Sequence, residues 1–248
     1  MLNYLGGEIY RVLHKKSMYI YFGSFAVLFF LFAAFGSKHN IENLRGTAEN
    51  FFSLLPPVVG GYLFGALYTD DLSSKNLTTL VGFGISKLKI VLSKCILMTL
   101  FSAFVFGLIP LFVVGCFAVF GVVPDAETFK VVYIHALTQL LTVVAFAALS
   151  GIVVYGVQRN TFAIVLYIVL AFGVISNLMM LLLNADIVRG FAPDLDKYLM
   201  SGVGIASRIE AGLLKGESVL GVFAEYAVYV AAALGLSVFA FRGKELEF

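Results

Sequence analysis

The feature that most limits how this chain can fold is a series of long apolar runs that hold almost no charge. A helix needs about 20 residues to cross a bilayer core, and six runs approach or exceed that length: residues 19–35, 51–68, 95–120, 131–155, 162–183 and 219–241. Charged residues make up 13% of the chain, whereas about a quarter is typical of soluble domains. The sequence therefore predicts an all-α polytopic membrane protein with six transmembrane helices in one domain, residues 1–248.

The distribution of basic residues orients the predicted spans. An even number of spans places both termini on one side, which carries ten of the 17 Lys and Arg residues but five of the 15 acids. Because cytoplasmic loops are enriched in Lys and Arg, we expect a multi-pass protein of the bacterial plasma membrane with both termini in the cytoplasm. Residues 184–218 then lie outside, where apolar stretches interrupted by Pro193 and Gly202 predict short helices at the outer face before the last span.

The segment before the first run, residues 1–18, has the pattern of an interfacial helix. Apolar residues from Tyr4 to Leu13 can line one side, and the charged residues lie on or beside the other: Glu8, Arg11, Lys15 and Lys16. A helix of this kind lies along the lipid headgroups. Anchoring to membrane lipids is the simplest interpretation, and contact with a partner protein is the alternative.

The polar, basic stretch between the second and third runs, residues 70–94, cannot cross a membrane. It holds six charged residues, and each would cost about 2.5–3.5 kcal/mol at the bilayer centre. Leucine, valine and isoleucine recur at helical spacing from Leu77 to Leu88, and Asp71, Ser73 and Ser74 can cap a helix. We expect an amphipathic helix facing the cytoplasm. It either packs against the bilayer or the protein's own spans, or it docks a soluble partner.

Several glycines and polar residues inside the predicted spans are candidates for a transport pathway. They are Gly61, Gly65, His135, Gln139, Asn177 and Glu225. The two glycines form a G-x-x-x-G pattern that favours close helix packing, with a moving hinge as the alternative. The histidine and glutamine share a polar face with two threonines, which predicts hydrogen bonds between helices or a face toward the substrate. The glutamate can snorkel outward or pair with Arg208 or Lys215.

These features together resemble the permease subunits of type-2 ABC transporters, a bacterial family of six-span exporters. The resemblance rests on the segment "EIYRVLHKKSMYI", on an acid at the end of span two, on the following "LTTLVGFGISKLKIVLSK" and on the long outer segment before span six. It implies that residues 70–94 form a coupling helix seated on a separate ATPase. The implied docking residues are Asp70, Asp71, Lys75, Leu77, Leu80, Val81, Gly84, Ile85, Ser86 and Lys87, with Glu8 and Arg11 as further contacts.

The sequence and the resemblance together predict a transport subunit, not an enzyme. The chain has no G-x-x-x-x-G-K-[ST] phosphate loop, so ATP and Mg²⁺ would be bound by the partner ATPase and this chain would hold no cofactor. The expected activity is export of an amphiphilic, hydrophobic or peptide substrate. The expected partners are ABC ATPase subunits, membrane lipids and a second copy or a sister permease, and no nucleic acid. A secondary transporter or channel without an ATPase is the alternative.

No metal site or disulfide is expected. Cys95 and Cys116 lie about six helical turns apart in one run, too far to bridge. His135 has no carboxylate near it on its own predicted helix, so the sequence alone gives little support for proton relay there.

Overall fold

The computed structural model describes residues 2–35, 40–70, 76–184, 195–200 and 204–243, and within these ranges the chain forms helices and no strand. The helices in chain order are α1 (Leu2–Leu13), α2 (Lys16–Phe35), α3 (Ile41–Leu55), η1 (Pro56–Gly60), α4 (Gly61–Phe64), η2 (Gly65–Thr69), α6 (Asn76–Gly82), α7 (Lys87–Val119), α8 (Ala126–Val157), α9 (Asn160–Ala171), α10 (Val174–Leu183), η3 (Leu195–Tyr198), α12 (Ile205–Lys215) and α13 (Leu220–Arg242). The predicted all-α class is confirmed.

Five helical stretches of the described chain are long and apolar enough to cross a membrane: α2, the continuous stretch from α3 to η2 (Ile41–Thr69), α7, α8 and α13. The predicted run 162–183 is not one straight helix, because α9 and α10 meet at an angle of 60°. Gly173 lies between them in the left-handed region, with φ of +72°, a conformation that glycine adopts without a steric penalty. The crossing of a sixth span therefore stays a prediction.

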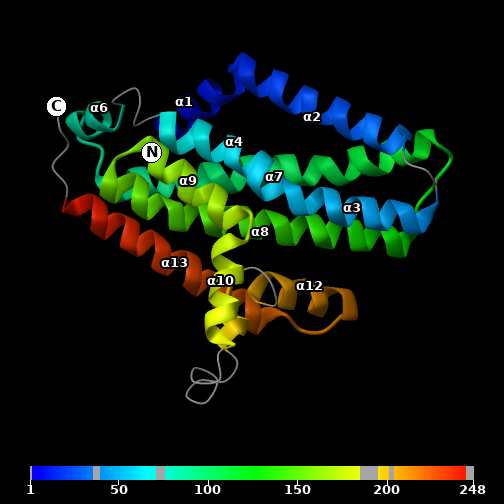
Figure 1. Cartoon of the computed structure of the whole chain (residues 1–248). Helices are drawn as coiled ribbons and strands as arrows, with labels where there is room; N and C mark the ends of the chain where they lie inside the picture. The colour runs from blue at the N-terminus through cyan, green and yellow to red at the C-terminus, as the bar shows by residue number, and fades with distance from the viewer. Residues whose placement is uncertain (1, 36–39, 71–75, 185–194, 201–203, 244–248) are drawn as a thin grey trace.

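The spans pack around α8, the most buried of them. Helices α3, α7, α9, α12 and α13 all contact it, and Figure 1 shows α3, α7 and α8 running side by side along the long axis of the molecule. Helices α2 and α13 keep most of their surface outside this core. Helices α1 and α6 lie at the same end of the bundle as the end of α13, and the α7–α8 turn lies at the opposite end (Figure 1).

Span two changes its helical type three times, from α to π, back to α and again to π. The segments η1 and η2 are π-helical turns on either side of α4. Pro56 and Pro57 begin the first of them, and proline cannot donate the backbone hydrogen bond of a regular α-turn. The widened turn places Gly60 directly against Tyr167 of α9, so the close approach of helices occurs there.

The closest approach in span two is therefore at Gly60 and not at the glycines of the predicted G-x-x-x-G pattern. A Cβ added at Gly61 would come no closer than 3.9 Å to the Tyr167 ring, and one at Gly65 would meet only Thr69 of the same helix, at 4.0 Å. Each π-turn holds more residues than an α-turn, so it rotates the glycines that follow to a different side of the helix. A pattern counted at regular α-helical spacing does not include this rotation.

The expectation of one helix across residues 70–94 is also wrong. Helix α6 ends at Gly82, and Gly84 is left-handed with φ of +78°. The amide of Gly84 donates to Val81 O (2.9 Å) and that of Ile85 to Leu80 O (3.1 Å), which is the Schellman pattern that ends helices at glycine. Ser86 then caps α7 by accepting a hydrogen bond from the Lys89 amide. Residues from Lys87 onward belong to the third span.

Candidate functional site

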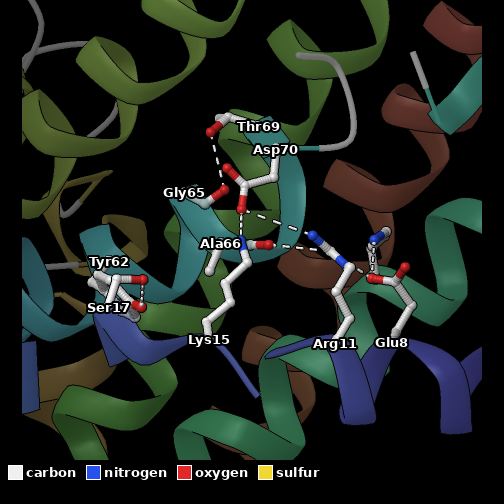
Figure 2. A network of polar contacts seen from close by, with 10 residues as sticks. Glu8, Arg11, Lys15, Ser17, Tyr62, Gly65, Ala66, Thr69 and Asp70 are labelled. Atoms are coloured by element: carbon white, nitrogen blue, oxygen red, sulfur yellow. Dashed lines mark hydrogen bonds and ion pairs between the residues drawn. The ribbon is translucent and has the colours of Figure 1, made fainter. Parts of the chain in front are cut away.

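A network of charged residues joins α1 to two spans at the α6 end of the bundle. Arg11 Nη2 donates to Glu8 Oε2 (2.7 Å) and to the Ala66 carbonyl of η2 (3.2 Å). Lys15, in the turn between α1 and α2, pairs with Asp70 at the end of span two, and Arg11 lies 3.8 Å from the same carboxylate. Figure 2 shows the side chains of Arg11 and Lys15 converging on Asp70. Helix α1 is thereby fixed to span two.

The same network reaches α7 through an ion pair between Glu8 and Lys94. Lys94 Nζ lies 2.7 Å from Glu8 Oε2, and the side chains are 1% and 9% exposed. Burial opposes ionisation of Glu8, but Lys94 and Arg11 outweigh it and hold the pKa of this carboxyl below its usual range. The ammonium group of Lys94 also lies 5.7 Å from the ring centre of Tyr4. A lysine expected in a polar loop is thus a buried structural residue.

Most of the predicted docking residues are engaged within the protein. Leu77 is buried, and Leu80, Val81 and Ile85 pack partly against the core. Lys87 Nζ donates to the Phe241 carbonyl of α13 (2.8 Å) and lies 5.1 Å from the centre of that ring. Asp71 and Lys75 lie outside the described residues. The apolar stripe of the loop therefore contacts the protein's own spans, as the first of the two interpretations expected.

The exposed surface of this loop lies at the turn between α6 and α7. Phe83 is 80% exposed, and Gly84 and Leu88 are exposed beside it. Sequence reasoning placed Gly84 on a helical face and did not select Phe83. The signal was available, since a glycine followed two residues later by a serine marks a helix end and a new N-cap.

The four charged residues predicted on the N-terminal helix separate into two groups. Glu8, Arg11 and Lys15 contact other parts of the protein, as described above. Lys16 is the first residue of α2 and is exposed. Only the last is placed for contact with lipid headgroups or a partner without loss of an internal ion pair.

A second polar cluster lies between α8 and α12. His135 Nδ1 lies 2.8 Å from Glu210 Oε1, and Thr138 Oγ1 donates to Glu210 Oε2 (3.3 Å). The hydrogen bond with His135 is the main cause that lowers the pKa of the Glu210 carboxyl. The sequence did not place a carboxylate beside this histidine, because the acid comes from a helix 75 residues further along the chain.

A small cavity of about 130 Å³ adjoins this cluster. Gln139, Thr138, Thr142 and Glu210 supply much of its polar lining, together with Ser53 and Ser207. Three residues of the predicted polar face of the fourth span thus line this cavity.

The other pathway candidates do not line that cavity. Glu225 forms a bidentate ion pair with Arg208 of α12, at 2.7 and 3.2 Å, which was one of the partners considered for it. Asn177 is exposed on α10. Gly61 and Gly65 lie further along span two. Gln139 lines the cavity and His135 contacts its lining residue Glu210, whereas the other four candidates lie elsewhere.

Comparisons with known proteins add no identification. No protein-family model matches the chain, and no curated protein sequence matches it. Among the residues that the structure describes, no group of three or more His, Cys, Asp and Glu side chains is placed to hold a metal ion.

Proposed function

We propose that this chain is the membrane-spanning permease subunit of an ABC transporter and that a separate ATPase binds it at the α6–α7 turn. The observation that supports the proposal most strongly is Phe83, a large apolar side chain that is 80% exposed at the tip of a short helix. An exposed phenylalanine at the end of a bundle matches the apolar anchor of a helix-in-groove contact. The resemblance to type-2 permeases in this same loop points to the same partner.

The tip is suited to transmit movement because its base is attached to three helices. Leu77 buries α6 against the core, Lys87 bonds to the end of α13, and Lys94 of α7 pairs with Glu8 of α1. A rigid displacement of the α6–α7 turn would therefore reach α1, α7 and α13 together. Switching by rigid-body movement of packed helices is a common mechanism.

The proposed activity is export, from a plasma membrane in which both termini are cytoplasmic. The substrate class is amphiphilic, hydrophobic or peptide-like, and a second copy or a sister permease completes the pathway. The cavity beside His135 is a candidate part of that pathway, since buried polar groups in spans usually face a cavity or a substrate route.

Replacing Phe83 by Asp is expected to abolish binding of the ATPase while the membrane domain stays folded. Loss of an apolar anchor at the centre of an interface costs about 2–4 kcal/mol of binding, or roughly thirtyfold to a thousandfold in affinity. The measurement is ATP turnover in complexes purified in mild detergent. It is paired with a photo-crosslinking amino acid at position 83 and sequencing of the captured chain for a phosphate-loop motif.

Val123→Asp is the matched control for this experiment. Val123 is 75% exposed in the turn at the opposite end of the bundle. The variant therefore adds the same charge at an apolar position of similar exposure. We expect full ATP turnover in this variant. A wild-type protein that captures no phosphate-loop ATPase would contradict the proposal.

The proposed orientation makes a separate prediction. In a background without Cys95 and Cys116, Phe83→Cys should react with a membrane-impermeant maleimide in inverted vesicles only, and Val123→Cys in right-side-out vesicles only. Both residues are exposed in turns, so accessibility depends on the side of the membrane. The reverse pattern would place the α6–α7 turn outside, where no cytoplasmic ATPase reaches it.

A proton-coupled secondary transporter is the second candidate function, favoured by the contact between His135 and Glu210. A histidine hydrogen-bonded to a carboxylate beside a cavity is an arrangement that proton-coupled transporters use. This candidate requires no ATPase, and the crosslinking experiment at position 83 separates it from the first.

A further inference from the structure

A large apolar groove separates α2 from α7, next to the turn between α1 and α2. It has a volume of about 430 Å³ and its lining is almost wholly apolar. Phe22 and Phe25 of α2 and Phe101, Phe104 and Phe112 of α7 form much of its walls. This volume falls in the range of sites that hold small molecules, about 300–1,000 Å³.

The groove exists because α2 has small residues on the side that faces α7. Gly23 and Ala26 line it, and a Cβ added at Gly23 would meet no atom within 4 Å. On another side α2 is fixed to span two, where Tyr21 stacks on Tyr62 with ring centres 4.6 Å apart and donates to the Val58 carbonyl (2.8 Å). The helix is therefore held in place while a gap to α7 remains.

The length of the groove matches half a bilayer. Along α7 its lining extends from Phe101 to Phe112, about 16 Å at 1.5 Å per residue. The hydrocarbon core is about 30 Å thick, so one leaflet contributes about 15 Å. Beyond this length the two helices approach each other, with the ring centres of Phe29 and Phe112 5.8 Å apart. The groove therefore has room for the chain of a lipid from one leaflet.

The end of the groove nearest to α1 lies beside an exposed lysine. Leu13, Met18 and Tyr19 line that end, and the residues between Leu13 and Met18 are His14, Lys15, Lys16 and Ser17. Lys15 pairs with Asp70, whereas Lys16 is exposed directly before the groove residues of α2. Basic residues at a membrane surface attract anionic lipid headgroups.

We infer that this groove binds an anionic phospholipid, with one acyl chain between α2 and α7 and its phosphate close to Lys16. The aromatic walls would make van der Waals contacts with the acyl chain, and these contacts are missing when the groove is empty. The site goes beyond the proposed transport function and depends on neither an ATPase nor the direction of transport. It lies in whichever leaflet holds the α1–α2 turn.

The chain contains no tryptophan, so a single introduced tryptophan reports on the groove alone. Phe101→Trp places the probe at a buried lining residue, and Phe22→Trp is a second position if the first variant does not fold. The protein is reconstituted in bilayers that contain either brominated phosphatidylglycerol or brominated phosphatidylcholine, because bromine quenches tryptophan fluorescence on contact. Phe239→Trp, at a residue of α13 that is 78% exposed, reports ordinary contact with bilayer lipid.

We expect quenching of the groove tryptophan to show that the groove binds the brominated anionic lipid about fivefold more strongly than the neutral lipid. This is the effect of one lysine near an anionic headgroup. Lys16→Gln should remove this preference. Gly23→Leu should reduce quenching by filling the groove. Gly107→Leu is the control, because this glycine of α7 also has no atom within 4 Å of an added Cβ but does not line the groove. It should leave quenching unchanged.

Several results would overturn the inference. Equal quenching of the groove tryptophan by the two lipids would remove the headgroup preference. Quenching no stronger than at position 239 would remove the site itself. If neither lipid quenches the groove tryptophan at high protein density, but both do when the protein is diluted in the bilayer, the groove is occupied by a second copy of the chain.

Discussion

Glu8→Gln is expected to lower the free energy of unfolding by about 3–5 kcal/mol, the usual cost of removing one member of a buried ion pair. The variant leaves the ammonium group of Lys94 in a site where its side chain is 1% exposed. A neutral amide gives a far weaker compensating interaction than a carboxylate at 2.7 Å. The measurement is unfolding by sodium dodecyl sulfate in mixed micelles, followed by circular dichroism.

Two further variants decide whether the buried charge is the cause. Glu217→Gln removes an exposed glutamate beyond the end of α12 and should change the free energy of unfolding by less than about 0.5 kcal/mol. The double variant Glu8→Gln with Lys94→Met removes the buried ammonium group as well and should recover most of the loss. A double variant as unstable as Glu8→Gln would show that the ion pair itself, and not burial of a lysine without its carboxylate, carries the stability.

The same pair predicts how stability depends on pH. The pKa of Glu8 is lower in the folded protein than its reference value of 4.5. Its contribution is therefore fully present above that reference value and is lost as the pH falls through the lower, folded value. The stability difference between wild type and Glu8→Gln should stay constant at neutral pH and shrink below about pH 4.5. A difference that already shrinks between pH 8 and 6 would contradict this.

The sequence predicted the spans well because hydrophobic length is a local property. Runs of apolar residues identified α2, α7, α8 and α13, but the helix ends depend on capping and not on hydropathy. Asn40, Ser86 and Asp125 each accept a hydrogen bond from the third backbone amide of the helix that follows. As a result α3 and α7 begin well before the predicted apolar runs at residues 51 and 95.

The contacts of Glu8 with Lys94 and of His135 with Glu210 could not be predicted, since each joins residues far apart in the chain. Lys94 follows a basic loop in sequence and was assigned to it, yet its partner Glu8 is 86 residues away. The sequence showed no carboxylate near His135 on its own helix, because its partner Glu210 belongs to α12. In each case residue type and spacing on one helix carry no information about which neighbour packs against it.

These contacts change how the α6 end of the bundle is understood. The apolar stripe from Leu77 to Ile85 was expected either to pack within the membrane domain or to face a partner, and much of it contacts the protein. Among the described residues of this loop, Phe83 is the large apolar side chain with the greatest exposure, at 80%. A variant at Leu80 or Ile85 would disturb folding and docking together, which is why position 83 gives the sharper experiment.

Gly60→Val is expected to destabilise the protein by about 3 kcal/mol, at the upper end of the usual cost of overpacking a core. A Cβ at this position would overlap the hydroxyl oxygen of Tyr167 and lie 2.9 Å from Val143 Cγ2. All three residues are buried, and the Tyr167 hydroxyl donates to the Pro56 carbonyl in the π-turn (3.1 Å). The tyrosine therefore cannot move aside without losing a buried hydrogen bond. The measurement is again detergent unfolding.

Gly65 provides the control, because a side chain added there meets no close neighbour. Gly65→Ala, where the nearest atom to an added Cβ is 4.0 Å away, should leave stability unchanged or raise it by up to about 1 kcal/mol through helix propensity. Combining Gly60→Ala with Tyr167→Phe removes the overlapping oxygen. The two changes together should therefore cost at least about 1 kcal/mol less than the sum of the single variants. Strict additivity would mean that the clash with Val143, and not the close approach of span two to α9, limits the residue at position 60.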